Sequence, residues 1–344
     1  MKTKFTILIT ALLLVCQVNA QNTLTVDNSA GANAQYNNLQ TAISVATAGD
    51  IIYVHPSETS YGNISINKSI TIIGFGHLNP EKRTEVEDII LGDGASNTKI
   101  SGFYINDDLI ASNSALISNL VIENNYVKSY LGFDTSGGVD NVIVRGNIIA
   151  QMGTTNSATN YNNYTNTIIS NNVFVHNYLG LKNYQSITVK NNIFIKASYN
   201  TPIYNAGVGD ITVQNNIVIY DSASNEDPNS SGVVFENCMI YNFGSGNVAL
   251  PTGTNNLYNQ DPLFVSTDNP GYGFYAEIDD YHLQAGSSAK GTGAGGVDMG
   301  LYDGTGVFNN YGYTKGVPSV KITNITDRIA PGANLSVDIT SKAN

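Results

Sequence analysis

A short motif built around paired asparagines recurs through the middle of the chain. Each copy has a β-branched apolar run, a polar residue, the pair and then a second apolar run. The second residue of the pair is called here the central residue of the motif. The central residues are Asn125, Asn147, Asn172, Asn192, Asn216 and, in the last full copy, Cys238. Consecutive central residues lie 22, 25, 20, 24 and 22 positions apart.

The spacing of this motif restricts the fold class. Apolar residues fall at every second position within a copy, which is typical of strands and does not fit the period of a helix. One period is too short for a propeller blade, which takes roughly 40 residues and four strands. The repeat therefore predicts an all-β fold, a single-stranded parallel β-helix (β-solenoid) in which each copy forms one coil.

In such a coil, equivalent side chains stack at roughly 4.8 Å along the axis. We expect the residues five and three positions before the central residue to point inward. The central asparagine should lie at the bend, because asparagine tolerates left-handed backbone angles and its amide both donates and accepts hydrogen bonds. A column of amides should then join the coils. The expected inward residues are Leu120, Val142, Ile187, Ile211, Val233, Ile122, Val144, Ile169, Val189, Val213 and Phe235.

Residues 1–20 are typical of a secretory signal peptide. Two lysines precede an apolar run over residues 5–15, and residues 18–20 provide a small-residue cleavage site. The run is shorter than the roughly 20 residues of a membrane span, and no other run is long enough. We therefore predict a secreted, extracellular protein without a membrane span. A lipid anchor on Cys16 is the alternative.

The predicted β-helix occupies residues 21–305, and both of its ends need a cover because an open sheet edge invites aggregation. Apolar residues at helical spacing follow Asn38, which predicts a short N-terminal cap helix. Residues 306–344 hold two apolar segments on either side of Pro331-Gly332, which predicts a C-terminal β-hairpin. We interpret this hairpin as a C-terminal cap, and the alternatives are the stub of a further module and a cell-surface sorting segment.

The composition argues against some classes of partner. Lys and Arg number 16 and Asp and Glu number 27, so the formal net charge is -11. Phosphate binding needs clustered basic residues, and we therefore expect no nucleic-acid partner. Without residues 1–20, Cys238 is the remaining cysteine, so the core must hold the fold without an intramolecular disulfide. We expect a monomer.

The copies of the motif resemble the right-handed parallel β-helix repeats of the pectin-lyase-like superfamily. Residues 49–54 and 61–74 are similar to the opening coil of secreted bacterial β-helix proteins. Residues 259–265, 280–287 and 298–300 resemble their closing segment. The resemblance extends over about residues 36–303 and implies a right-handed coil in a secreted protein. It implies no single reaction, because the superfamily includes lyases, hydrolases, epimerases, adhesins and proteins without a known activity.

Two outward rows of polar side chains form the candidate ligand-binding surface. The first row lies two residues before the central residue, and the second lies four residues after it. Stacked one per coil, the rows would form a groove that contacts successive units of a polysaccharide; the alternative is a solvated face whose ion pairs contribute little. The substrate-binding candidates in these rows are Glu123, Gln214, Glu236, Lys196 and Tyr220.

A polysaccharide lyase of this superfamily would need a base, often Lys or Arg, and a calcium ion held by several acidic residues. The candidate catalytic residues are Arg145, Lys190 and His176. We expect no cluster of three or more carboxylates on adjacent coils. Asp107 and Asp108 are adjacent carboxylates, but neighbours on a strand face opposite sides. The sequence therefore predicts no metal site and no cofactor. It contains no clear motif for binding a calcium ion.

These features favour a non-catalytic protein that binds an extracellular polysaccharide. A polysaccharide lyase or glycoside hydrolase acting in the groove is the alternative. Tyrosines in the predicted loops favour binding, because sugars stack on exposed aromatic faces. These loop tyrosines are Tyr130, Tyr161, Tyr164, Tyr178, Tyr184, Tyr199 and Tyr204.

Overall fold

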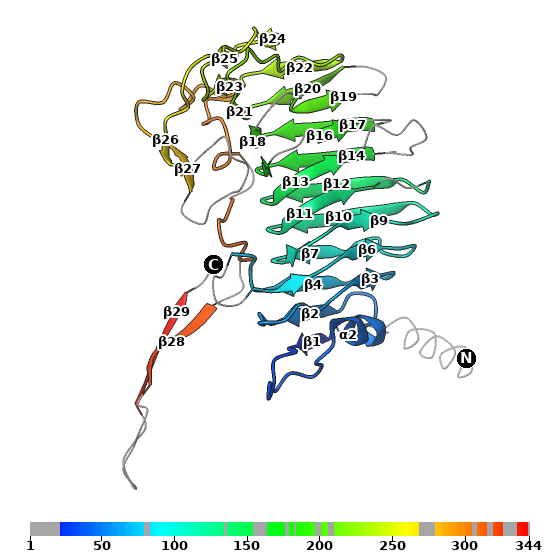
Figure 1. The fold of residues 1–344 in the computed structure, drawn as a ribbon. Helices are drawn as coiled ribbons and strands as arrows, with labels where there is room; N and C mark the ends of the chain where they lie inside the picture. The colour runs from blue at the N-terminus through cyan, green and yellow to red at the C-terminus, as the bar shows by residue number, and fades with distance from the viewer. Residues whose placement is uncertain are drawn as a thin grey trace, which may run out of the picture.

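The protein is a right-handed parallel β-solenoid of about 8 turns (Figure 1). This confirms the fold class predicted from the asparagine repeat. The structure is a computed structural model and describes residues 21–78, 83–133, 136–153, 164–175, 179–181, 184–196, 201–205, 210–267, 279–304, 308–314, 319–325 and 336–342.

Two parallel sheets form the walls of the solenoid. Sheet 1 has 11 strands and contains the first apolar run of each copy, whereas sheet 2 has 14 strands and contains the second. Sheet 1 consists of β1 (Thr23–Val26), β2 (Ile51–Val54), β4 (Thr71–Gly74), β7 (Lys99–Ser101), β10 (Ile117–Glu123), β12 (Val139–Arg145), β14 (Tyr164–Ser170), β17 (Tyr184–Lys190), β20 (Ile211–Gln214), β22 (Val233–Glu236) and β24 (Gly253–Thr254).

The main path of sheet 2 consists of β3 (Ile64–Ile66), β6 (Ile89–Leu91), β9 (Leu109–Ala111), β11 (Tyr126–Gly132), β13 (Ile148–Gly153), β15 (Val173–Val175), β18 (Ile193–Lys196), β21 (Ile217–Tyr220), β23 (Met239–Asn242) and β25 (Leu257–Tyr258). The strands off this path are β5 (Glu85–Val86), β8 (Tyr104–Ile105), β16 (Leu179–Leu181) and β19 (Ile203–Asn205).

The main core lies between the sheets, and like side chains stack along it. In sheet 1, Ile122 pairs with Val144 and Val144 pairs with Ile169, and all three side chains are buried. The other expected inward residues are also buried, except Ile187, which is partly buried and packs against the core. Burying an aliphatic side chain of this size contributes roughly 1.5–3 kcal/mol, so the stacked columns supply the main driving force for folding.

The two residues of the motif have different roles at the bend between the sheets. The first residue adopts the left-handed conformation, with φ of 56° at Asn124, 65° at Gly146 and 55° at Asn171. The expectation that the central asparagine is itself left-handed is therefore wrong. The first residue turns the chain, and this leaves the central side chain free to point into the stack.

The central asparagines form the predicted column of amides. Asn172 Oδ1 accepts hydrogen bonds from the backbone N and the Nδ2 of Asn147, both at 3.0 Å. The same two bonds join Asn125 to Asn147, Asn172 to Asn192 and Asn192 to Asn216. All five side chains are fully buried. Each amide thus satisfies a backbone N–H that the bend would leave without a strand partner.

A second column of asparagines, which was not predicted, lies six residues before the central position, and Asn119, Asn141 and Asn166 are inside strands of sheet 1. Asn97, Asn119, Asn141 and Asn166 have φ between 47° and 61°. Asn141 Nδ2 donates to Asn119 Oδ1 at 2.7 Å, and Asn119 Nδ2 donates to Asn97 Oδ1 at 2.8 Å. These asparagines are exposed, so their amide bonds are also open to water.

The predicted N-terminal cap helix is α2 (Leu39–Val45). Asn38 is its N-cap, and its Oδ1 accepts a hydrogen bond from the backbone N of Thr41 at 2.8 Å. Such a cap stabilises a helix by about 1 kcal/mol. The helix buries Leu39, Ala42 and Ile43 against the first strands and so covers that end of the core (Figure 1).

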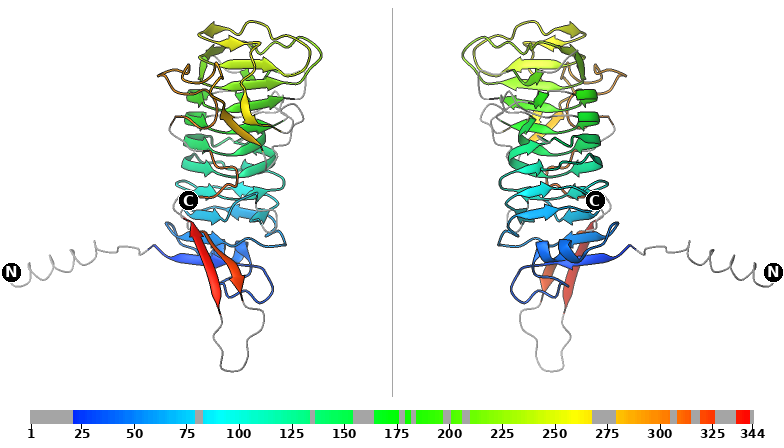
Figure 2. Two further views of the ribbon diagram at one scale, coloured as in Figure 1. Left: turned by 90° about the vertical axis from the view of Figure 1, so that its left-hand side faces the viewer. Right: turned by 90° about the vertical axis from the view of Figure 1, so that its right-hand side faces the viewer.

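After the last rung, the chain returns along the outside of sheet 2. β26 (Phe264–Ser266) and β27 (Asp280–Leu283) form an antiparallel pair, and residues 284–304 and 308–314 then run back toward the N-terminal rungs (Figures 1 and 2). We call residues 279–304 and 308–314 the strap. Its end reaches the first rungs, where Tyr311 O accepts a hydrogen bond from the backbone N of His77 at 3.0 Å.

The left-handed asparagines hold the strap. Asn237 Nδ2 donates to Thr292 O at 3.0 Å, and Asn171 Nδ2 donates to Leu301 O at 2.7 Å. Asn191 Nδ2 donates to Gly300 O at 3.2 Å. In these three pairs the first residue therefore both turns the chain and binds the returning segment.

A second apolar cluster lies between sheet 2 and the strap. The side chains one and three positions after the central residue point outward and are apolar in most copies. Together with strap residues they form a separate buried cluster that includes Ile148, Val173, Val175, Ile193, Ile195, Ile217, Ile219, Met239, Tyr281, Met299, Leu301 and Phe308.

The C-terminal hairpin is present but does not cover the C-terminal end of the solenoid. β28 (Ser319–Ile325) and β29 (Val337–Lys342) pair antiparallel, as predicted. They lie beside the N-terminal rungs and far from β24 (Figures 1 and 2). The expectation that this hairpin caps the last rung is wrong, because the strap carries the chain back along the axis first. No helix among the described residues is long and apolar enough to cross a membrane.

Candidate functional site

The first predicted outward row forms a straight line of residues on sheet 1, although Ser101, Glu123 and Ser170 are buried. Its members are aligned by direct strand pairing, with Glu123 opposite Arg145, Arg145 opposite Ser170, Ser170 opposite Lys190 and Gln214 opposite Glu236. We call this set the polar row. It contains Ser101, Glu123, Arg145, Ser170, Lys190, Gln214 and Glu236.

Glu123 is the centre of an ion-pair group in the polar row. Its carboxylate lies 2.5 Å from Lys99 Nζ and 2.7 Å from Arg145 Nη2. Burial raises the pKa of Glu123, but the hydrogen bonds and charges of Lys99 and Arg145 outweigh burial and hold its pKa below the ordinary value. Glu123 is therefore ionised, and Arg145 serves it as a counter-ion.

The other part of the polar row is more open. Lys190, Gln214 and Glu236 are half-buried, and Gln214 Nε2 donates to Glu236 Oε2 at 2.9 Å. Lys190 forms no ion pair with any residue that the structure describes, so its ammonium group can bind a ligand. At the opposite end, Ser101 is buried against Thr314 of the strap, with 2.6 Å between the hydroxyl oxygens. The accessible members are therefore Arg145, Lys190, Gln214 and Glu236, and the buried Ser170 lies between Arg145 and Lys190.

A column of smaller side chains runs beside the polar row. It lies four residues before the central residue and is aliphatic except at Thr188 and Thr212. Ile168 is 38% exposed, and Thr188 and Thr212 are exposed. The exposed asparagine column borders it on the far side. We call the polar row, this column and the asparagine column the outer face of sheet 1.

The second predicted outward row is wrong at Tyr220 and Asn242, whereas on earlier rungs Ser129 is exposed and Gln151 is half-buried. Tyr220 is fully buried in the main core and Asn242 is also buried, so Tyr220 cannot contact a ligand on the surface. The reason is strand alternation: a residue four positions after the bend shares a face with the residue two positions after it, and that face points inward. Lys196 has its backbone in β18, but its side chain lies outside the described residues, as does the whole of His176.

The loop tyrosines give a mixed result. Tyr204 is 41% exposed, and Tyr130 is half-buried. Tyr161, Tyr178 and Tyr199 lie outside the described residues. Tyr164 and Tyr184 begin strands β14 and β17, and their side chains are also outside the described part.

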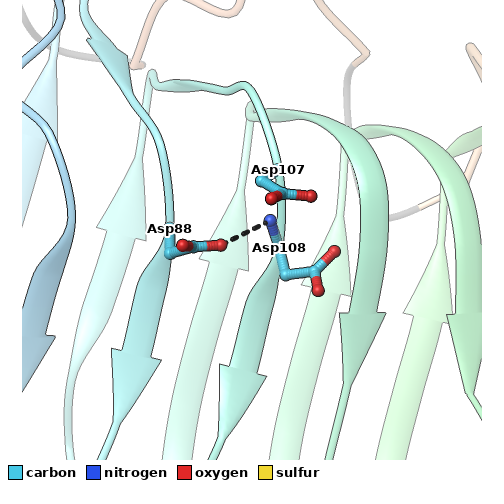
Figure 3. A group of neighbouring side chains, drawn as sticks. All are labelled: Asp88, Asp107 and Asp108. Carbon is cyan, nitrogen blue, oxygen red and sulfur yellow. Dashed lines mark hydrogen bonds between the residues drawn. The ribbon is translucent and has the colours of Figure 1, made fainter.

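A group of carboxylates, called here the acidic cluster, lies on adjacent rungs of sheet 2. Asp88, Asp107 and Asp108 place one oxygen each within 4.8 Å of one another (Figure 3). The expectation that no three carboxylates gather on adjacent coils is wrong, because Asp107 and Asp108 lie in a bend before β9 and not on a strand. The backbone N of Asp108 donates to Asp88 Oδ1 at 3.1 Å.

Oxygen ligands of this kind suit a hard cation such as Ca²⁺, which takes roughly six to eight of them. The acidic cluster offers fewer than that from its three carboxylates. It precedes β6 and β9 of sheet 2, whereas Arg145 and Lys190 are on sheet 1. The cluster therefore lies apart from the candidate bases of a lyase.

Sequence reasoning also missed a pocket near the last rungs. It is lined by Ile219, Tyr241, Phe243, Asp261, Leu263, Phe264 and Gln284, among others. These residues come from two strands of sheet 2 and from the returning chain, so no single sequence segment signals it. No family model matches the chain, and no curated protein is similar enough to count as a match.

Proposed function

We propose that this chain is a secreted, non-catalytic protein of the pectin-lyase-like superfamily that binds an extracellular polysaccharide along the outer face of sheet 1. The observation that supports this most is the alignment of the polar row, which strand pairing keeps straight from Arg145 to Glu236. A linear polymer presents the same groups at a regular interval, and a solenoid presents one side chain per rung at roughly 4.8 Å.

The chemistry of the outer face suits hydroxyl-rich ligands. Lys190 donates hydrogen bonds, Glu236 accepts them, and Gln214 does both. Ile168 offers apolar contact to the C–H groups of a sugar, and the neighbouring threonines add hydroxyls. Each contact is weak, but contacts along one polymer add together because the first one holds the next unit nearby.

The positions of the carboxylates argue against glycoside hydrolysis by this row. An acid/base pair needs its carboxyl groups roughly 5–9.5 Å apart. Glu123 and Glu236 are separated by five rung steps in the strand pairing, which at 4.8 Å per step is roughly 24 Å. Lys190 has the exposure that the base of a lyase would need. The binding experiment below therefore also measures turnover.

The test is binding of the purified protein to a panel of soluble polysaccharides, with turnover measured in the same samples. We expect retention on at least one glycan and no new reducing ends or unsaturated products. The double variant Lys190→Ala/Gln214→Ala should weaken that binding about tenfold, roughly 1.4 kcal/mol. Lys128→Ala is the matched control, because Lys128 is exposed on sheet 2.

Two results would contradict the proposal. If no glycan binds, or if the double variant binds like Lys128→Ala, the outer face is not the site. If unsaturated products appear and Lys190→Ala abolishes them, the protein is a lyase. Secretion is tested separately, by showing that the mature protein begins at Gln21.

A further inference from the structure

The pocket near the last rungs is a separate candidate ligand site, built on a different sheet from the polar row. Ile219 of β21 and Tyr241 of β23 are paired neighbours and form one side of it. Phe243, Leu263 and Phe264 add apolar surface, and Asp261 and Gln284 add polar groups. We propose that this pocket binds a single uncharged sugar ring, such as the end residue of a glycan.

Several of the apolar side chains that line the pocket are exposed to water. The side chain of Phe243 is 51% exposed and that of Leu263 is 37% exposed, while Tyr241 and Phe264 are half-buried. Aromatic rings carry negative charge on their faces, and these attract the C–H groups of a ligand. A pyranose ring has an apolar face of C–H groups and an edge of hydroxyls. It therefore matches a site with rings on one side and polar groups on the other.

The polar part of the pocket has atoms that are free to bind. Asp261 Oδ1 accepts a hydrogen bond from the backbone N of Leu263 at 2.8 Å, and Gln284 Nε2 donates one to Phe264 O at 2.8 Å. Asp261 Oδ2, Gln284 Oε1 and the Tyr241 hydroxyl form no hydrogen bond with any described residue. Burial and the charge of Asp261 both raise the pKa of Tyr241, so its hydroxyl keeps its proton.

These groups select the class of ligand. A carboxylate oxygen and an amide oxygen both accept hydrogen bonds, so the ligand must donate them. Sugar hydroxyls do so, whereas the carboxylate of a uronate would meet the negative charge of Asp261. The pocket should therefore prefer a neutral sugar over a uronate of the same ring geometry.

The pocket is held in shape by its own backbone. Leu263 has φ of 51°, a left-handed conformation that is uncommon for a bulky residue and costs of order 1–3 kcal/mol. The Asp261 hydrogen bond supports it from one side. From the other, the backbone N of Gln284 donates to Leu263 O at 2.9 Å, and Phe264 pairs with Leu283. The ring of Phe264 also packs against buried Tyr281 at 5.0 Å between centroids.

The experiment is ligand-detected NMR on the full-length protein with methyl glycosides of glucose, galactose, N-acetylglucosamine and galacturonic acid. We expect at least one neutral glycoside to bind with Kd on the order of 1 mM, as a small ligand in a shallow site does. The uronate should bind at least tenfold more weakly. Phe243→Ala should reduce binding of the neutral sugar at least fivefold, and Asp261→Asn should reduce the discrimination against the uronate. Val265→Ala is the control, because Val265 is 51% exposed nearby but does not line the pocket.

The inference depends on the proposed function only in expecting a sugar, and the two can fail separately. If monosaccharides bind here while polysaccharide binding is absent, the proposed function is refuted and the pocket assignment stands. If no monosaccharide binds, or if Phe243→Ala binds like Val265→Ala, the pocket assignment is overturned. A dimer that Phe243→Ala dissociates would also overturn it, because the aromatic side chains would then be covered by a second copy.

Discussion

Removing one side-chain amide from the central column should strongly lower the free energy of unfolding, because one amide makes several buried hydrogen bonds. Asn192 is fully buried, and its Oδ1 accepts two hydrogen bonds from Asn172, one from the backbone N and one from Nδ2, both at 3.0 Å. Its Nδ2 donates to Asn216 Oδ1 at 3.0 Å and to Ile169 O at 3.1 Å. Asn192→Ala deletes all of these bonds.

The main cost comes from the backbone N–H of Asn172, which is left buried without an acceptor. An unsatisfied buried group costs about 1–3 kcal/mol, and each further lost hydrogen bond costs about 1 kcal/mol. We therefore expect Asn192→Ala to lower the free energy of unfolding by about 4–6 kcal/mol. The measurement is urea unfolding followed by far-UV circular dichroism. Thr188→Ala, an exposed change on the same rung, should stay within about 0.5 kcal/mol of wild type.

The chain itself offers the reverse experiment. Cys238 occupies the column position after Asn216, and its Sγ lies 3.9 Å from Asn216 Nδ2, which is a weak contact. Cys238→Asn should restore an oxygen acceptor there and raise the free energy of unfolding by about 1 kcal/mol. A loss below 1 kcal/mol in Asn192→Ala, together with destabilisation by Cys238→Asn, would refute the idea that the amide column joins the rungs.

Three further predictions concern the core, pH and charge. Val189→Asp places a carboxyl group in the main core, where Val189 is buried, and should abolish cooperative thermal unfolding; unchanged melting would show that Val189 does not face inward. His77 is fully buried, and neither ring nitrogen has a hydrogen-bond partner among the described residues. Burial, with a contribution from the charge of Arg83, lowers the pKa of His77 from 6.5 to about 3. Below pH 6.5 the unfolded chain binds a proton that the folded protein excludes, so stability should be complete above pH 6.5 and fall by roughly 4 kcal/mol as the pH drops toward 3. His77→Leu should reduce that slope, and an unchanged slope in urea unfolding at several pH values would contradict the assignment. Asp107→Asn should raise the melting temperature by relieving repulsion in the acidic cluster, more at low salt than at high salt; a lower melting temperature would show that the Asp107 carboxylate has a stabilising partner.

The parts of the fold that could be predicted are those that repeat. Inward stacking and the amide column follow from residues that recur at one position in most copies. The left-handed residue was assigned to the wrong member of the pair because most copies have asparagine at both positions. One copy carries the missing signal, since Gly146 stands where the others have the first asparagine, and glycine favours that conformation.

The candidate site could be predicted only where it depends on the repeat. The polar row lies on sheet 1, whose outer side is open, so strand alternation places it correctly. On sheet 2 the continuous apolar run of β21 should have indicated a strand covered on both faces, as in buried parallel sheets. The pocket and the acidic cluster depend on the returning chain and on one local bend, and neither recurs along the sequence.

The strap changes how a protein of this architecture should assemble. In most solenoids each repeat contacts only its neighbours, so folding can begin anywhere and spread along the array. Here the hydroxyls of Ser101 and Thr314 meet across 213 positions of sequence, and the outward apolar side chains of sheet 2 lose their contact with water only when the strap arrives. Such distant contacts slow folding. The N-terminal rungs therefore reach their final packing only after residues 279–314 have been synthesised.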